Sequence, residues 1–309
     1  MWNRYRADPF FLIRYSVGSI VLCALIIRFH ATIPGVAAIH WGWFAAAALL
    51  VLPNFYLQAV AALGFSAVCF GLDTPANRLL LPPLAVSGLF LGCYAAVAIH
   101  TASHQAFRPR WVNRIVGEVC GVLLLTGYAT FLIPHLAHHR YPDDPLRDPH
   151  PPGHLSFPAY LNGMVPTLVA CMNRLYADLW AGRDGRYPWL SRITRTLIPL
   201  AFLMRVLLLL VLLRPMLFAY LFVPLYIAEL MLFAHVNYMT HRPDPAGGFM
   251  ILDLKDGIFH RVMNAVFLGT YCHRTHHLRP YLLNPSRAAP DDRPMRTYGQ
   301  VITSRSTNG

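Results

Sequence analysis

The sequence predicts an all-α integral membrane protein with about six transmembrane helices and one further interfacial or re-entrant helix. Of the 309 residues, 56% are hydrophobic and only 13% are charged. The apolar residues come in runs of about 17 to 20, the length that a helix needs to cross a bilayer. One soluble core does not require so much continuous apolar sequence. The predicted crossings are Phe10 to Phe29, Val36 to Leu52, Asn54 to Phe70, Leu81 to Ile99, Leu197 to Leu213 and Met216 to Ala234.

A further apolar run, Ile115 to Ile133, is long enough to cross the bilayer but is predicted not to do so. Histidine clusters flank it on both sides, one beginning at His100 and the other at His135. A full crossing would separate these clusters onto opposite faces of the membrane. We therefore expect this run to form the interfacial or re-entrant helix.

The basic residues predict the orientation of the chain in the membrane. Most of the 26 lysines and arginines precede the first crossing, lie between His100 and Thr196, or follow Ala234. The positive-inside rule places these segments, the histidine clusters and both termini in the cytoplasm. This membrane face accounts for the formal charge of +12, so no nucleic-acid partner is expected. Apart from Arg14, near the start of the first crossing, the basic residues left for the spans and the opposite side are Arg28, Arg78, Arg205 and Arg214.

We predict one domain over residues 1–287, with its core at 81–281, and a polar C-terminal tail at 288–309. Arg214-Pro215 predicts a break between the last two crossings, because proline cannot continue a helix without losing a hydrogen bond. The six cysteines are scattered and form no CxxC pair, which favours reduced packing residues.

Ten of the fifteen histidines occur in four short groups, each after an apolar run. On a helix, the spacing of HTASH places two imidazoles on one face, and the spacing of HLAHH and HRTHH places three there. One such group alone is more often a set of interfacial histidines, but three together favour metal binding. Imidazole suits iron, copper, nickel and zinc, and one catalytic zinc needs only about three protein ligands. Eight or nine histidines therefore suffice for two metal ions.

The motifs HTASH, HLAHH and HRTHH resemble the three histidine boxes (HxxxH, HxxHH and HxxHH) of membrane fatty acid desaturases. Their order, their spacing and the spans between them all agree over about residues 81–281. In that family an asparagine precedes a ninth ligand histidine by four residues, and NYMTH matches this pattern. The resemblance implies a cytoplasmic di-iron cap. Its iron ligands would be His100, His104, His135, His138, His139, His241, His273, His276 and His277, with Asn237 bound through water.

Other polar residues lie close to these motifs. His235 stands outside the box pattern and is either a hydrogen-bond partner of the site or an interfacial histidine. Asp143, Asp144 and Asp148 follow the second box, where a carboxylate can hold the second N–H group of a ligand imidazole; a solvated turn is the alternative. The histidines without partners at ligand spacing, which we expect to have no role in the chemistry, are His30, His40, His150, His154 and His260.

A closer resemblance is confined to three short stretches of the sequence. The stretches AIHTASHQAF, HLAHHRYPDDPLRDP and HRPDP look like the desaturase-like β-carotene hydroxylases, including Asp144-Pro145 and Asp148-Pro149. The chain departs from that pattern at Thr101, where those proteins usually have aspartate, and at Arg140 to Pro142.

The resemblance implies an enzyme, an oxidoreductase with two non-haem iron ions and O2 as co-substrate. It would desaturate or hydroxylate an unactivated C–H bond of a lipid, first of all a fatty-acyl chain, with ring hydroxylation of a carotenoid as the alternative. The residues alone leave another class open, a zinc-dependent membrane hydrolase or receptor. No GxGxxG after a strand and no cysteine cluster is present, so a separate ferredoxin- or cytochrome b5-like carrier with its reductase would supply electrons.

Overall fold

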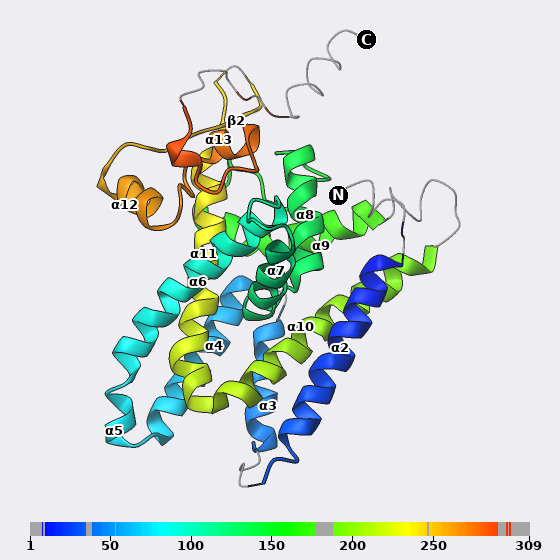
Figure 1. Ribbon diagram of the computed structural model, residues 1–309, viewed down its shortest axis with the longest axis vertical. Helices are drawn as coiled ribbons and strands as arrows, with labels where there is room; N and C mark the ends of the chain where they lie inside the picture. The colour runs from blue at the N-terminus through cyan, green and yellow to red at the C-terminus, as the bar shows by residue number, and fades with distance from the viewer. Residues whose placement is uncertain are drawn as a thin grey trace. The chain divides into compact units, whose positions relative to one another are not determined.

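The computed structural model describes residues 8, 10–34, 39–52, 54–176, 188–245, 247–289, 295 and 297. The described chain is mostly helical and contains one two-stranded antiparallel sheet, which confirms the predicted helical class (Figure 1). The start of the predicted crossing at Val36 and most of the predicted tail lie outside the described residues. The predicted single domain over 1–287 stays a prediction.

The chain divides into two compact units, each assembled from three separate stretches. The first unit takes residues 1–93, 121–130 and 175–229, and the second takes 94–120, 131–174 and 230–309. The longer helices are α2 (Phe11–His30), α3 (Trp41–Ala48), α4 (Phe55–Leu72), α6 (Leu81–Ser103), α7 (Trp111–Leu123), α8 (Tyr128–Arg140), α9 (Phe157–Tyr176), α10 (Pro188–Leu217), α11 (Val223–Thr240) and α12 (Ile258–Val266). The shorter elements are η1 (Leu49–Val51), α5 (Pro75–Arg78), η3 (Phe218–Phe222), β1 (His241–Pro243), β2 (Phe249–Ile251), α13 (His273–Leu278) and η4 (Pro285–Arg287).

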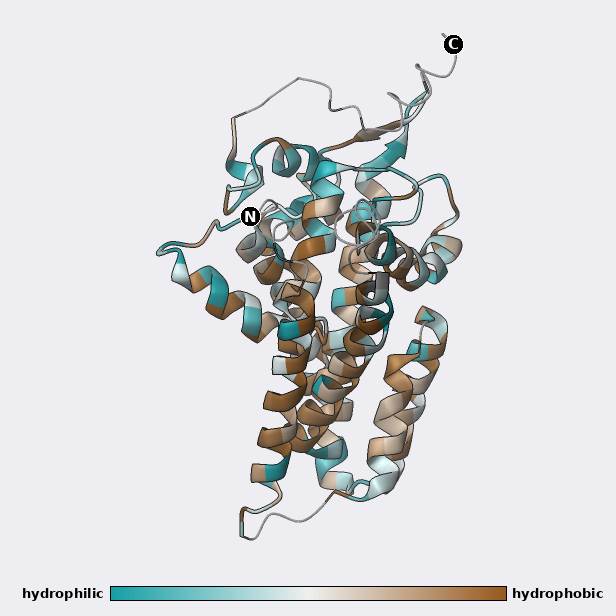
Figure 2. Cartoon of the chain, turned by 90° about the vertical axis from the view of Figure 1, so that its right-hand side faces the viewer, coloured by the Kyte–Doolittle hydropathy of each residue, from teal (hydrophilic) through white to brown (hydrophobic). Residues whose placement is uncertain are grey.

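Four described stretches are long and apolar enough to cross a bilayer: α2, α4, α6 and Arg192–Thr240. The bent pair α7 and α8 would make a fifth, and Trp41–Val51 is apolar but shorter. Figure 2 shows mostly apolar residues on the long helices in the lower part of the view, and more polar residues on the helices and loops in the upper part. The chain is therefore an integral membrane protein, and the count of six crossings stays a prediction.

The stretch Arg192–Thr240 contains 49 residues, which as one straight helix would measure about 70 Å. That is more than twice the roughly 30 Å of the hydrocarbon core. The helix is broken at Arg214, where φ is 64° and ψ is 160°, immediately before Pro215. This break confirms the predicted interruption, and in Figure 1 the chain reverses its direction between α10 and α11.

Helices α7 and α8 are bent by 102° relative to each other, so the predicted re-entrant segment is not one straight helix. Leu125 and Gly127 both have positive φ values at the bend, 61° and 73°. The buried Arg205 of α10 donates from Nη1 to the backbone oxygen of Leu125 at 3.1 Å. This bond pairs a carbonyl that the bend removes from the helical ladder, and an unpaired carbonyl is costly in an apolar environment.

Two glycines allow α6 to approach the following helices closely. A side-chain carbon at Gly88 would overlap the backbone oxygen of Leu221 in η3, and one at Gly92 would overlap that of Leu225 in α11. Small residues four apart are typical of tightly packed membrane helices. The GxxxG spacing of Gly88 and Gly92 thus explains why backbone meets backbone here.

Candidate metal centre

The three histidine boxes lie on three short stretches of the second unit. His100 lies in the last turn of α6 and His104 follows one residue after its end. The second box forms the end of α8, and the third box forms most of α13. The second and third boxes are therefore helical, as their histidine spacing predicts. His241 begins strand β1, directly after α11.

The nine predicted histidines fall into two spatial groups. Within each group, one ring nitrogen from every histidine lies within 4.8 Å of the others. We call them the five-histidine group and the four-histidine group. The five-histidine group consists of His100, His104, His135, His139 and His276, and the four-histidine group consists of His138, His241, His273 and His277.

Ring nitrogens converge inside each group. In the five-histidine group, Nε2 of His104 lies 2.6 Å from Nε2 of His135, and the Nε2 atoms of His139 and His276 are 2.9 Å apart. Because His104 and His135 meet, the segment between them starts and ends at the same place. The predicted re-entrant path of α7 and α8 agrees with this contact and stays a prediction.

In the four-histidine group, Nε2 of His277 lies 3.2 Å from Nε2 of both His138 and His273. Nε2 of His241 is buried and has no hydrogen-bond partner among the described residues. A buried polar atom without a partner is costly unless something else binds it. Several imidazoles aimed at one point, with one nitrogen unpaired, fit a bound metal ion.

The electrostatics favour neutral imidazoles, the form that binds a metal. Burial, together with the neighbouring histidines, lowers the pKa of His273, His276 and His277 well below the usual value. His241 differs from them. Burial lowers its pKa, but the charge and hydrogen bond of Asp143, together with the charge of Asp148, outweigh that effect, so the pKa of His241 is raised.

Two carboxylates orient members of the four-histidine group. Nδ1 of His241 lies 3.0 and 3.1 Å from the two oxygens of Asp143, and Nδ1 of His138 lies 2.9 and 3.1 Å from those of Asp148. All four side chains are nearly inaccessible to solvent. Each carboxylate fixes the tautomer of its imidazole and directs Nε2 toward the group.

Asp144, which the sequence also suggested for this role, has different contacts. Its Oδ1 accepts hydrogen bonds from the backbone nitrogens of Leu146 and Arg147, and its Oδ2 lies 3.7 Å from the Arg147 guanidinium. Asp144 thus shapes the turn after the second box, and Asp143 contacts the histidine in its place. The sequence pattern placed all three aspartates correctly in the loop but did not distinguish their directions.

His150 is a residue that the spacing of the motifs missed. Its ring centroid lies 4.7 Å from that of His138, and it forms a third group of possible ligands with His138 and Asp148. Burial chiefly lowers the pKa of His150, to about 3. The available signal was its position two residues after Asp148, whose carboxylate accepts a hydrogen bond from the His150 backbone.

His235 and Asn237 occupy different surroundings on α11. Nδ1 of His235 lies 2.5 Å from the hydroxyl of Tyr271, and His235 belongs to neither histidine group. Asn237 donates to the backbone oxygen of Phe233 at 2.8 Å, and its Oδ1 is buried without a partner among the described residues. The side-chain oxygen of Asn237 is therefore available to a water or an ion.

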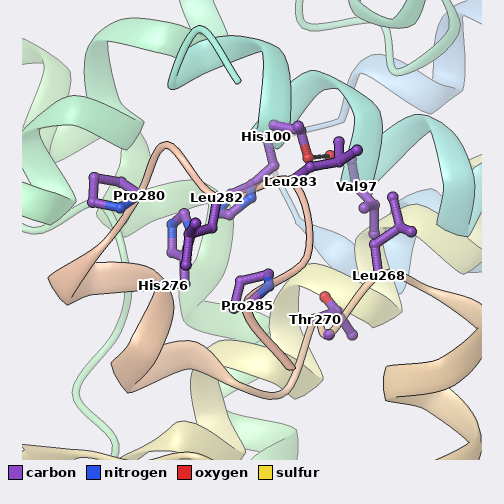
Figure 3. A pocket seen from close by; sticks show the side chains of 11 residues that line it. Val97, His100, Leu268, Thr270, His276, Pro280, Leu282, Leu283 and Pro285 are labelled. Atoms are coloured by element: carbon purple, nitrogen blue, oxygen red, sulfur yellow. Dashed lines mark hydrogen bonds between the residues drawn. The ribbon is translucent and has the colours of Figure 1, made fainter. Parts of the chain in front are cut away.

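A small pocket borders the five-histidine group (Figure 3). Its volume is about 30 Å³, room for roughly two water-sized groups. Thr101 also contributes to the wall, and its hydroxyl donates to the Val97 backbone oxygen at 2.7 Å. The labelled lining residues in Figure 3 are Val97, His100, Leu268, Thr270, His276, Pro280, Leu282, Leu283 and Pro285.

These features define a class, an integral membrane protein with a histidine-rich site suited to two metal ions. The family model described as fatty acid desaturase matches residues 76–286, more than half of the chain. The chain belongs to the fatty acid desaturase family, which indicates an oxidoreductase. The comparison with curated proteins found no match, and neither did the comparison with solved structures.

Proposed function

We propose that the chain is an O2-dependent oxidoreductase that holds two iron ions and desaturates or hydroxylates an unactivated C–H bond of a fatty-acyl chain. The observation that carries this proposal is the division of nine histidines into one group of five and one of four. A mononuclear zinc site uses only about three protein ligands, so a hydrolase or receptor with one zinc leaves most of these histidines unexplained.

Each residue has a role that follows from its contacts. The five-histidine group and the four-histidine group would each hold one iron, and iron so bound supplies the reactivity toward O2 that protein side chains lack. Asp143 and Asp148 keep His241 and His138 in the tautomer that presents Nε2. Asn237 offers its unpaired oxygen to a water bound at the site.

The lining of the pocket suits an apolar lipid chain as the substrate. Its walls are largely aliphatic, and His100 and His276 bring it into contact with the five-histidine group. Aliphatic walls beside these histidines suit an apolar lipid chain that brings a C–H bond to the site. The carotenoid alternative rests on the local sequence likeness to the β-carotene hydroxylases. This sequence departs from their pattern at Thr101, which lines the pocket.

The chain would receive electrons from a separate acidic carrier, a ferredoxin- or cytochrome b5-like protein with its reductase. Arg140 is exposed and directly follows His139 of the five-histidine group. A basic side chain so near the site suits the docking of an acidic electron carrier. We place this side of the chain, and both termini, in the cytoplasm.

Mass spectrometry of acyl lipids and carotenoids from a host with and without the gene tests the proposed function. We expect new unsaturated or hydroxylated acyl chains that disappear in the His276→Ala variant. Products formed only from carotenoids would support the ring hydroxylase instead. No change in either lipid class, from protein that contains two irons and is supplied with a carrier, would contradict the proposal.

A pair of neighbouring variants tests the pocket. Leu282 lines the pocket, whereas Tyr281 is 62% exposed and does not line it. Leu282→Trp should fill the space beside the five-histidine group and lower product formation at least tenfold, while Tyr281→Trp should keep it. Equal activity of the two variants, at equal iron content, would show that substrate does not enter here.

A further inference from the structure

Helix α12 has its polar and apolar faces reversed relative to a helix of a water-soluble protein. Its exposed positions include Ile258, Phe259 and Val262, which are 76%, 52% and 54% exposed. Asn264, on the opposite side, is buried. A helix in contact with water turns its apolar stripe toward the protein core, so the arrangement here is that of a helix facing an apolar medium.

The inward orientation of the polar face is fixed by hydrogen bonds. Nδ2 of Asn264 donates to the backbone oxygen of Leu254 at 2.9 Å, and its Oδ1 accepts from the backbone nitrogen of Tyr271 at 2.8 Å. One side chain thereby joins the segments before and after the helix. Rotating α12 to bury Ile258 and Val262 would break both bonds, so their exposure is a consequence of the fold.

The end of α12 is attached to a membrane-spanning helix. The hydroxyl of Tyr94 in α6 donates to the backbone oxygen of Val266 at 3.1 Å, and the Tyr94 ring lies 5.1 Å from that of Phe267. Tyr94 belongs to the same compact unit as α12 and is itself 43% exposed. Tyrosine is enriched where a span meets the lipid headgroups.

We propose that α12 lies in the interface of the bilayer that surrounds the chain, with Ile258, Phe259 and Val262 inserted among the upper parts of the acyl chains. The occupant of the exposed apolar face is thus membrane phospholipid, because the attachment to Tyr94 continues the surface of a membrane-spanning helix. Arg261 of the same helix is also exposed and can reach the phosphate groups.

This placement gives the pocket a route to its substrate. Leu268, Gly269 and Thr270 follow α12 almost directly and line the pocket beside His100 and His276. A chain that enters from the lipid around α12 would meet the five-histidine group without passing through water. The location of α12 does not depend on which lipid is oxidised.

Fluorescence quenching in vesicles tests the proposal. Single cysteines replace Ile258, Val262 or the exposed Ser286 in the full chain, which is labelled with an environment-sensitive dye and reconstituted in phosphatidylcholine. Wild type carries six cysteines, most of them buried, and gives the background. We expect phospholipid with a nitroxide near the head of its acyl chain to quench the labels at 258 and 262 several-fold more than the label at 286. Iodide should show the reverse order.

The opposite results would overturn the proposal. Iodide quenching at 258 and 262 as strong as at 286 would show that α12 faces water. Protection from iodide without quenching by the nitroxide lipid would show that a second copy or another protein covers the helix. Gel filtration of each labelled variant in detergent serves as the control for folding.

Discussion

The contact between Asp143 and His241 gives a sharp test of how the four-histidine group is held together. In Asp143→Asn the negative charge is lost while an oxygen remains to accept the hydrogen bond from Nδ1. The backbone at Asp143 has φ of 60°, a conformation that asparagine tolerates as well as aspartate does. The substitution therefore changes the charge beside His241 with little change of the loop.

The size of the effect follows from the burial of the pair. The side chains of His241 and Asp143 are only 5% and 6% exposed, so water does not screen their interaction. A hydrogen bond to a charged group contributes about 1.5–3 kcal/mol and a neutral one about 0.5–1.5 kcal/mol. The midpoints of these ranges differ by about 1.25 kcal/mol, which corresponds to nearly tenfold weaker metal binding. Asp143→Ala should cost more, up to about 100-fold.

Iron retention against increasing chelator measures this effect. In Asp143→Asn one of two irons per chain should leave at about tenfold lower chelator concentration, while the other is retained as in wild type. Asp144→Asn is the matched control, because Asp144 contacts the backbone of its own turn and no histidine of either group. Equal losses in the two variants, or no loss in either, would refute the role assigned to Asp143.

Three further predictions concern single residues. His241→Ala should lose one iron and essentially all turnover. His235→Ala alters a residue outside both groups, so it should keep both irons and lose at most about 10 to 100-fold in activity. Iron analysis and a turnover assay measure both effects, and the reverse order would show that the ligand set is wrong. Arg205→Met should destabilise the chain by about 1–3 kcal/mol, because it leaves a carbonyl of the α7–α8 bend unpaired. The melting temperature in detergent should therefore fall, and an unchanged melting temperature would contradict the role of Arg205. Gly92→Ala should disturb the packing of α6 and lower the yield of monodisperse protein, whereas Gly64→Ala, whose added Cβ meets no atom within 4 Å, should be tolerated.

Spacing and the family resemblance together named the nine histidines that lie in the two groups, and their binding of metal stays a prediction. The i, i+3, i+4 pattern requires only that the second and third boxes be helical, and both are. Spacing along the chain does not determine which histidines share a metal. His138 and His139 are adjacent in sequence but belong to different groups, because successive residues on a helix point about 100° apart.

Features that depend on long-range contacts were not predictable. The choice of Asp143 over Asp144 depends on a positive φ value and on the position of β1, neither of which a single sequence shows. The sequence likewise does not predict that the apolar face of α12 is exposed, because its short apolar pattern resembles that of a buried helix. The break at Arg214 was predictable, since proline acts on its own helix.

Metal analysis of the purified full chain tests the central claim most directly. Elemental analysis, made together with a turnover assay, should give two irons per chain for wild type. It should give about one iron when a histidine of either group, such as His276 or His241, is replaced by alanine. One zinc per chain with full activity would contradict the claim that the two histidine groups form a two-iron centre.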